Sequence, residues 1–302
     1  MKKLLFLIAI LILSDGIQAQ LLYAISSNGL ERPSYIIGTH HLVDASFTTK
    51  IVGLEKALRE TDQVYGEVVM SDMTNPDSMA ALQSLSLLPD GKTLRDVLTA
   101  DQFTRLDRCF YDVVGAKLSS EQLYAALGRM TPSGLSSYLT VMLYLKNHPG
   151  EVDVQNTIDG WFQIEAARNG KYVGGLESIA FQAQLLMQSG NLDEQIVSLM
   201  CFVDNLDLSL MMLNDLTDAY HQQDLEGVRI AMEGDMGDGC PSLASEEGDE
   251  LLYNRNTRWV TLMPAIMKER PTFFAVGAAH LVGPRGVLQM LREAGYTVEG
   301  VR

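Results

Sequence analysis

Basic residues are scarce in this sequence. Its 302 residues contain 23 Lys and Arg against 38 Asp and Glu, so the formal net charge is −15. A protein that binds nucleic acid neutralises phosphates with a basic surface, whereas a chain this acidic is repelled by DNA, RNA and anionic lipid. The charge balance therefore excludes nucleic acid as a partner.

Cysteines are also few, and several common catalytic motifs are missing. Cys109, Cys201 and Cys240 form no Cys-x-x-Cys pair, which excludes a cysteine-based metal knot and a multi-bridge disulfide scaffold. We expect Cys201 to be buried in an apolar helix, and a single disulfide that uses Cys109 or Cys240 stays open. The sequence has no Gly-rich phosphate loop, no nucleophile elbow and no H-E-x-x-H helix.

The apolar run at the start of the chain is too short to cross a membrane. Lys2 and Lys3 precede the unbroken apolar run Leu4–Leu13, and the small residue Ala19 follows at a suitable cleavage point. A bilayer needs about 20 apolar residues, so residues 1–19 are interpreted as a secretory signal peptide. We expect a mature protein without a stable membrane span, periplasmic or secreted in a bacterium; an uncleaved tether is the alternative.

Short apolar runs that alternate with helical patterns indicate an α/β fold. A strand, a helix and a second strand follow one another within about 35 residues, the size of a βαβ unit, which favours a parallel sheet. We predict one domain over residues 20–302, with a central mainly parallel or mixed sheet flanked by helices and a large helical insertion. Helical segments at about 76–150 and 179–232 are expected to cover the site, and the acidic segment 233–250 is predicted to be a loop. Strands are predicted at 21–26, 34–37, 63–70, 171–177, 272–276 and 296–301.

Two Gly-x-x-His motifs stand directly after predicted strands. They are Gly38–His41 and Gly277–His280, and each follows a short apolar run. In open α/β sheets, ligands collect beyond the carboxyl ends of the strands, where glycine lets the backbone pass close to a bound group. We therefore expect His40, His41 and His280 to gather at that edge. The alternative is that the motifs are unrelated loop histidines.

Glu67 and Glu177 supply carboxylates at matching positions. Glu67 interrupts the apolar strand predicted at 63–70, and Glu177 ends the one at 171–177. An unpaired buried carboxylate costs several kcal/mol, so Glu67 must be paired, bound to a metal or exposed to water. Glu177 fits equally well at a helix N-terminus, where the helix dipole would stabilise its charge. Two His with one or two Glu suit a divalent transition metal, which would lower the pKa of a bound water.

Arg255 and Asn256 stand side by side on a helix predicted over 250–268. An Arg in this place could clamp a carboxylate or stabilise an oxyanion. An ordinary surface position for Arg255 is the alternative that the sequence leaves open.

These segments together resemble the TraB/GumN family, which is related to the Tiki metalloproteases and more distantly to the erythromycin esterase and ChaN-like groups. The stretch 76–149 carries no matching motif. The resemblance implies an α/β fold with helices covering the sheet, and an active site built from the two Gly-x-x-His segments and the glutamates. The matching segments follow in order along the mature chain: 35–41, Glu67, 170–177 with Gln182, 255–256, and 273–281 with Gly283.

The resemblance also implies roles for single residues. His41 and His280 would be metal ligands, together with Glu67 and Glu177, and the metal would be Mn or Co, with Zn or Fe as alternatives. Glu67 would also act as a general base, and no role is assigned to His40. The catalytic set would be Glu67, Arg255 and Asn256, the last two holding the substrate or supporting the ligands.

We therefore predict an exported metal-dependent hydrolase, peptidase-like, that acts on a peptide or a small-molecule substrate. In this hypothesis a metal-bound water attacks an amide or ester while Glu67 shuttles the proton. Two alternatives remain. The protein could be a non-catalytic one that sequesters a peptide or a haem in the same cleft, or a family member whose site has lost activity.

Overall fold

The structure is a computed structural model that describes residues 20–237, 239–241 and 248–302. The predicted signal peptide, residues 1–19, lies outside the described residues. Residues 238 and 242–247 of the acidic segment 233–250, which was predicted as a loop, also lie outside the described residues.

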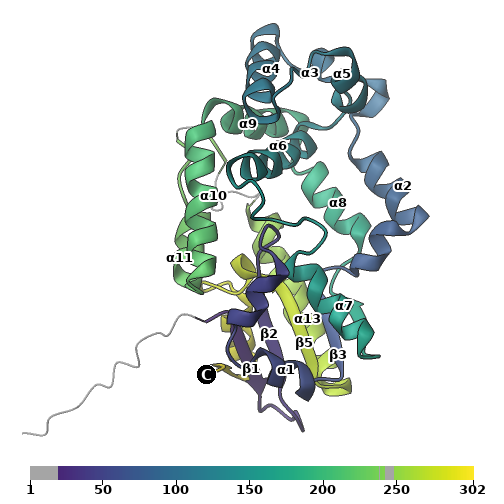
Figure 1. Cartoon of the computed structure of the whole chain (residues 1–302). Coiled ribbons are helices and arrows are strands. Elements are labelled where there is room, and N and C mark those ends of the chain that lie inside the picture. Colours follow the sequence, from purple (N-terminus) through teal and green to yellow (C-terminus); the bar gives the residue numbers. More distant parts are fainter. Residues whose placement is uncertain (1–19, 238, 242–247) are drawn as a thin grey trace, which may run out of the picture.

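A six-stranded sheet forms the lower part of the molecule as drawn in Figure 1. Its strands are β1 (Leu22–Ser26), β2 (Ser34–Thr39), β3 (Gln63–Gly66), β4 (Tyr172–Gly175), β5 (Thr272–Gly277) and β6 (Thr297–Gly300). Their order is β4-β3-β5-β2-β1-β6. β4, β3, β5 and β2 run parallel, and β1 is antiparallel to β2 and β6. The prediction of a mainly parallel or mixed sheet is confirmed.

β2 and β5, the two central strands of the sheet, are buried on both faces. Every residue of β2 is buried, and in β5 only the last residue is partly exposed. Strands covered on both sides read as continuous apolar runs, which is the pattern that the sequence shows. Helices that share one apolar cluster with the strands include α1 (Leu54–Glu60), α7 (Ile158–Arg168), α13 (Asn254–Glu269) and α14 (Val287–Glu293), and Tyr220, Leu225 and Val228 join the same cluster.

β3 is shorter than predicted. The strand predicted at 63–70 ends at Gly66 because the chain then turns and is held by Gln163 of α7. The Gln163 side-chain amide donates to the Val68 carbonyl at 2.8 Å, and its oxygen accepts from the Met70 N–H at 2.9 Å. A Cβ on Gly66 would lie 2.3 Å from Gln163 Nε2, so only glycine fits there. Glu67 therefore follows the strand and does not lie within it.

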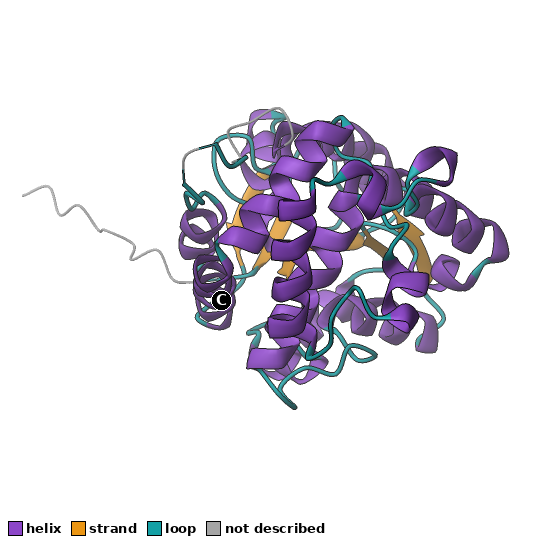
Figure 2. Ribbon diagram, turned by 90° about the horizontal axis from the view of Figure 1, so that it is seen from above, coloured by secondary structure: helices purple, strands orange, loops and turns teal. Residues whose placement is uncertain are grey.

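The predicted helical insertion is confirmed and carries its own apolar core. Its helices lie above the carboxyl ends of the parallel strands in Figure 1, and the view from above in Figure 2 shows them covering the sheet. Buried side chains of α4, α6 and α9, such as Phe110, Leu139 and Leu199, form a second cluster apart from the sheet core. The helices are α2 (Pro76–Leu85), α3 (Leu94–Val97), α4 (Ala100–Val114), α5 (Glu121–Leu127), α6 (Pro132–Asn147), α8 (Ile179–Met187), α9 (Leu192–Asp204), α10 (Leu206–His221) and α11 (Leu225–Met232).

One disulfide joins α9 to the acidic segment. Cys201 pairs with Cys240, so the expectation of an inert core thiol at Cys201 is wrong, while Cys109 is a free, buried cysteine. The reason is tertiary: the segment that follows α11 returns past the end of α9 and places the two cysteines next to each other. Their Cα atoms lie 5.7 Å apart, within the ordinary range for a disulfide.

Within residues 20–237, 239–241 and 248–302, no single helix is both long and apolar enough to cross a membrane. α9 and α10 reach that length and composition only when taken together, and they are bent by 88° at the break between them. α9 also contributes Leu199 and Phe202 to the second apolar core.

Candidate functional site

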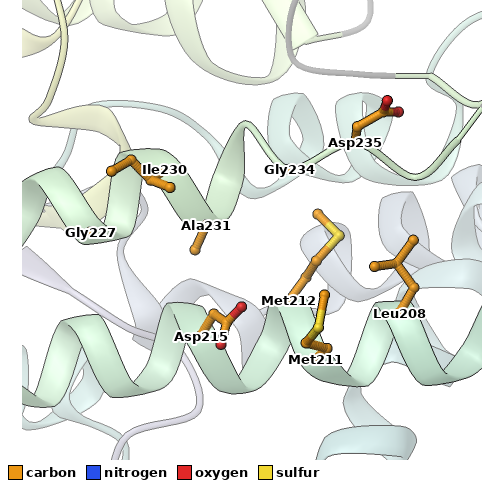
Figure 3. Close-up of a pocket in the computed structure, with 9 residues that line it drawn as sticks. All are labelled: Leu208, Met211, Met212, Asp215, Gly227, Ile230, Ala231, Gly234 and Asp235. Carbon is orange, nitrogen blue, oxygen red and sulfur yellow. The ribbon is translucent and has the colours of Figure 1, made fainter.

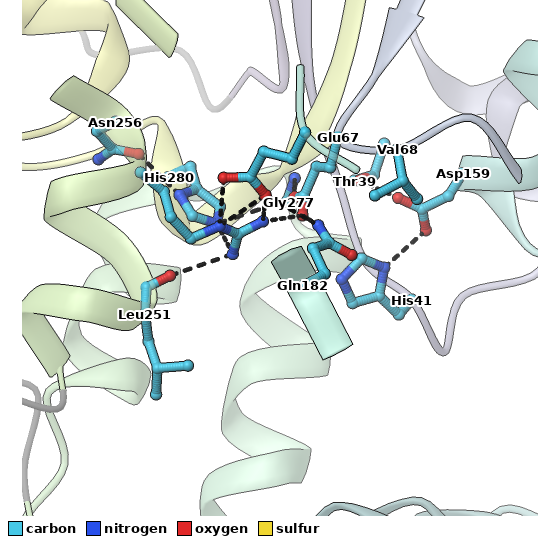
Figure 4. Close-up of polar contacts among 12 residues, drawn as sticks. Thr39, His41, Glu67, Val68, Asp159, Gln182, Leu251, Asn256, Gly277 and His280 are labelled. Atoms are coloured by element: carbon cyan, nitrogen blue, oxygen red, sulfur yellow. Dashed lines mark hydrogen bonds and ion pairs between the residues drawn. The ribbon is translucent and has the colours of Figure 1, made fainter. Parts of the chain in front are cut away.

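The parallel strands bring four predicted site residues to one edge of the sheet. Gly66, at the end of β3, pairs with residues of both β4 and β5, and the N–H of Glu177 extends this ladder by donating to the Glu67 carbonyl at 2.8 Å. Because carboxyl ends of parallel strands lie together, Glu177, Glu67, His280 and His41, which come after β4, β3, β5 and β2, all lie at this edge. Figure 4 shows His280 on one side of Glu67 and His41 on the other.

Arg255 ties three of these residues together from α13. Its guanidinium donates to both oxygens of Glu177 at 2.9–3.1 Å, to Glu67 Oε2 at 2.5 Å and to the Leu251 carbonyl at 3.1 Å. It also lies 3.0 Å from Nε2 of His280. Arg255 is only 8% exposed, so the surface alternative is wrong. We call Arg255, Glu67, Glu177 and His280 the Arg255 cluster.

Asn256 determines which nitrogen of His280 carries the proton. Its side-chain oxygen lies 2.7 Å from Nδ1 of His280, and its amide donates to the Arg285 carbonyl at 2.9 Å. A guanidinium has only donors, so Nε2 of His280 accepts from Arg255 and Nδ1 holds the hydrogen. Burial, with the charge of Arg255, lowers the pKa of His280 to about 3, so the ring is neutral at physiological pH.

Glu67 is held as a carboxylate. Its Oε1 accepts from the Gly277 N–H at 2.8 Å, and its Oε2 accepts from Gln182 at 2.8 Å as well as from Arg255. Burial works against the charged form, but His280, Arg255, His41 and the Gly277 N–H outweigh it and lower the pKa of Glu67 to about 2. Since His280 is neutral, Arg255 provides the main compensating charge. A Cβ at Gly277 would lie 3.2 Å from Glu67 Oε1, so a larger residue there would press on this carboxylate.

Glu177 lies near a helix N-terminus and is also paired with a cation. It directly precedes Ser178, the residue that caps the N-terminus of α8, so its charge lies near the positive end of that helix. Its side chain is 3% exposed and forms the ion pair with Arg255 described above. It contacts Arg258 only weakly, at 3.9 Å. Glu177 is therefore a buried partner of Arg255 behind the edge of the sheet.

His41 is paired with a residue that sequence reasoning missed. Its Nδ1 lies 3.2 Å from Asp159, which also accepts from the Thr39 hydroxyl. The charge of Asp159 raises the pKa of His41 to about 9, with a smaller contribution from Glu67, so the ring is protonated at neutral pH. Asp159 is in the first turn of α7 and belongs to no motif. Only the docking of α7 brings it to His41.

His40 points away from the site. Its Nδ1 accepts from the Leu42 N–H at 3.1 Å, its Nε2 lies 3.4 Å from the Thr217 hydroxyl, and its ring packs edge-on against Tyr220 of α10. Burial lowers the pKa of His40 to about 4. The expectation that three histidines gather at the edge is therefore wrong for His40, which packs beneath α10.

A cleft of about 440 Å³ opens beside the Arg255 cluster. His41, Glu67, Asp159 and Gln182 line its polar side, and side chains of α2 and α8 line an apolar side. A smaller hollow of about 280 Å³ lies between α10 and α11 (Figure 3), where Asp215 and Asp235 are the titratable lining residues. Chemistry that needs a histidine and a glutamate together therefore belongs to the larger cleft.

The side chains match a metal site in type but not in arrangement. Among the residues that the structure describes, no three His, Cys, Asp or Glu side chains are grouped so that they could hold a metal ion. Glu177 is taken up by Arg255, and Nε2 of His280 accepts from the same guanidinium. A metal held by His280 would require Arg255 to release that nitrogen first.

The pair of His41 and Asp159 gives a testable pH dependence. We expect Asp159→Asn to lower the pKa of His41 from about 9 toward the ordinary value of 6.5, because the largest favourable charge is removed while Arg255 still opposes protonation. In the wild type, the stabilisation from this pair is complete below the unfolded His pKa of 6.5 while Asp159 stays ionised, and it is lost as the pH rises through 9. Histidine NMR titration measures the pKa directly. An unchanged value in a folded Asp159→Asn variant would contradict the pairing.

Comparison with known proteins identifies the family of the chain. The profile of the TraB/PrgY/gumN family matches residues 21–300. Relatives include metalloprotease TIKI2 of Danio rerio, 26% identical over 88% of this chain and 58% of the relative, and metalloprotease TIKI1 of Homo sapiens, 27% identical over 88% and 59%. A metalloprotease TIKI homolog of Nematostella vectensis is 23% identical over 89% and 65%. The chain thus spans about three fifths of the length of these curated relatives. Its match over nearly all described residues shows that the chain belongs to the TraB/PrgY/gumN family.

Proposed function

We propose that this protein is a hydrolase of the metalloprotease-like type that cleaves an amide or ester bond in the cleft beside Glu67. The observation that carries the proposal is a pair of opposite charges: the carboxylate of Glu67 and the protonated imidazole of His41 line the same cleft. Its relatives are named metalloproteases, which supports this reaction class. The substrate is a peptide or a small molecule.

Each charge has a place in acyl transfer to water. Glu67 orients the attacking water and takes its proton, while His41 donates a hydrogen bond to the oxygen that becomes negative and then a proton to the leaving group. Arg255 and Asn256 position Glu67 and His280 from behind and do not line the cleft. With a pKa of about 2, Glu67 is a weak proton acceptor on its own.

We further propose a divalent transition metal, Mn or Co before Zn or Fe, with His41, His280 and Glu67 as ligands and Glu177 as a further ligand or a support. Imidazole and carboxylate are ligand types that these metals accept. When bound, the metal would lower the pKa of its water toward neutrality and so compensate for the weak basicity of Glu67. Uptake requires Arg255 to release His280 and His41 to lose its proton, so His41 would be a ligand in the metal-bound protein and a proton donor only in the metal-free protein.

Elemental analysis tests the metal proposal. We expect stoichiometric Mn or Co in protein purified without chelator, or after reconstitution, and its loss in His41→Ala and in the double variant His41→Ala/His280→Ala. The His41 side chain is 70% exposed, so the single variant is expected to fold normally. Metal retained in a folded double variant would contradict the ligand assignment. No uptake by the reconstituted wild type would contradict the metal itself and favour the sequestering alternative.

We also propose that the protein is exported, with residues 1–19 removed as a signal peptide. The disulfide between Cys201 and Cys240 supports this, because disulfides persist mainly in oxidising compartments. The mass of the N-terminal peptide of the protein purified from its native host tests the cleavage.

A further inference from the structure

One side of the cleft is apolar and partly uncovered. Three large side chains line it: Met73 from the turn after β3, Val154 from the segment before α7, and Leu186 from α8. They remain 46%, 57% and 44% exposed, respectively. Ala183, one turn before Leu186 on α8, forms its floor and is buried. Large apolar side chains that stay exposed inside a concavity next to reactive groups mark a place where an apolar group of a ligand binds.

α2 shows the same feature along a whole helix. The helix Pro76–Leu85 has no buried residue, and it packs against α8 at one edge of the cleft, where Leu82 is a lining residue. An amphipathic helix normally buries its apolar side against the protein. Here part of that side borders the cleft, so a bound group would complete its burial.

Charge is confined to the opposite side. Within the described part of the chain, no Lys or Arg lines the cleft, and its two carboxylates, Glu67 and Asp159, are already paired with Arg255 and His41. A charged side chain on the apolar side would lose its hydration without gaining a partner. Methionines at three lining positions, Met70, Met73 and Met187, adapt to differently shaped apolar groups.

We propose that this apolar side is a substrate-binding subsite, formed chiefly by Met73, Leu82 and Leu186, that selects a bulky uncharged side chain next to the bond that is cleaved. The inference rests on the proposed hydrolytic function and names its substrate class: peptides with Leu, Met or Phe at that position. Burying such a side chain is expected to favour it over Ser or Asp about tenfold to a hundredfold in kcat/KM.

The test uses the full mature chain, reconstituted with Mn or Co, and a set of capped peptides that differ only in one residue, Leu, Phe, Ser or Asp. Leu186→Gln is the test variant, and Leu262→Gln, a Leu of similar exposure (46%) on α13 outside the cleft, is the matched control. We expect Leu186→Gln to lower kcat/KM for the Leu peptide about tenfold and leave the Ser peptide unchanged. Leu262→Gln should change neither value, whereas a general loss of structure would lower both.

Binding measured in parallel tests the subsite separately from the proposed hydrolysis. Fluorescence anisotropy with labelled Leu and Ser peptides reports the subsite without catalysis. Hydrolysis with no preference for apolar residues would overturn the subsite and leave the hydrolase standing. Preferential binding of the Leu peptide without hydrolysis under any metal condition would keep the subsite and overturn the proposed reaction. Equal binding of both peptides would overturn the subsite.

Discussion

Replacement of Arg255 by Met is expected to lower the free energy of unfolding by about 3–5 kcal/mol, because it leaves two buried carboxylates without their shared counter-ion. Glu67 and Glu177 are 10% and 3% exposed at their side chains, so water could replace only a small part of the interaction with the guanidinium. His280 would lose a hydrogen bond at Nε2 as well. Urea denaturation followed by circular dichroism measures the loss.

Arg258 provides the matched control on the same helix. It is 43% exposed and approaches Glu177 only to 3.9 Å, so Arg258→Met should cost no more than an ordinary surface ion pair, about 1 kcal/mol or less. Similar losses from Arg255→Met and Arg258→Met would mean that the Arg255 cluster does not stabilise the fold.

The pH dependence of the same experiment identifies the carboxylate concerned. Glu67 has its pKa lowered to about 2, so its contribution to stability is present above its unfolded value of 4.5 and is lost as the pH falls from there toward 2. In Arg255→Met this dependence should shrink, because the charge that lowers the pKa is gone. If Arg255→Met lost stability between pH 4.5 and 2 to the same extent as the wild type, groups other than Glu67 would be responsible for the acid sensitivity.

Glu67→Gln is expected to reduce hydrolysis about 100-fold or more while leaving peptide binding in place. The amide keeps the shape of the side chain but cannot take a proton from water. Single-turnover assays with the Leu peptide, alongside anisotropy for binding, separate the chemical step from affinity.

Glu177→Gln is the informative comparison for this variant. It removes one negative charge from the same Arg255 cluster, yet Glu177 does not line the cleft. Both variants should lose stability, but hydrolysis per folded molecule should fall much further in Glu67→Gln. Equal losses of activity would show that Glu67 acts only through the integrity of the cluster.

The positions of the strands along the chain and the edge where Glu67, His280 and His41 lie were predictable because they depend on local patterns, whereas the order of the strands in the sheet was not predicted. Continuous apolar runs marked β2 and β5, and the carboxyl ends of parallel strands necessarily bring Glu67, His280 and His41 to one edge. The end of β3 was not predictable, since it depends on Gln163, which lies on a helix about a hundred residues away in the chain.

The partners of the site residues also could not be predicted from the sequence. Whether Arg255 is buried depends on which face of α13 packs on the sheet, and the pairing of His41 depends on where α7 docks Asp159. The same holds for Cys201, whose helix pattern indicated core but whose partner, Cys240, arrives by a tertiary return of the chain. His40 stands beside His41, yet the turn after β2 directs it to the opposite side.

The position of β5 has a consequence for how the chain matures. Residues 272–277 are made after the four strands β1 to β4, yet they form the strand that joins the pair β1–β2 to the pair β3–β4. A nascent chain can therefore make two separate half-sheets but cannot unite them, and folding that waits for such distant contacts is slow. The edge that carries Glu67 and His41 is complete only when residues 272–277 have been made and released. We expect forms that end before Thr272 to lack this edge, because β5 is the strand that joins the two pairs.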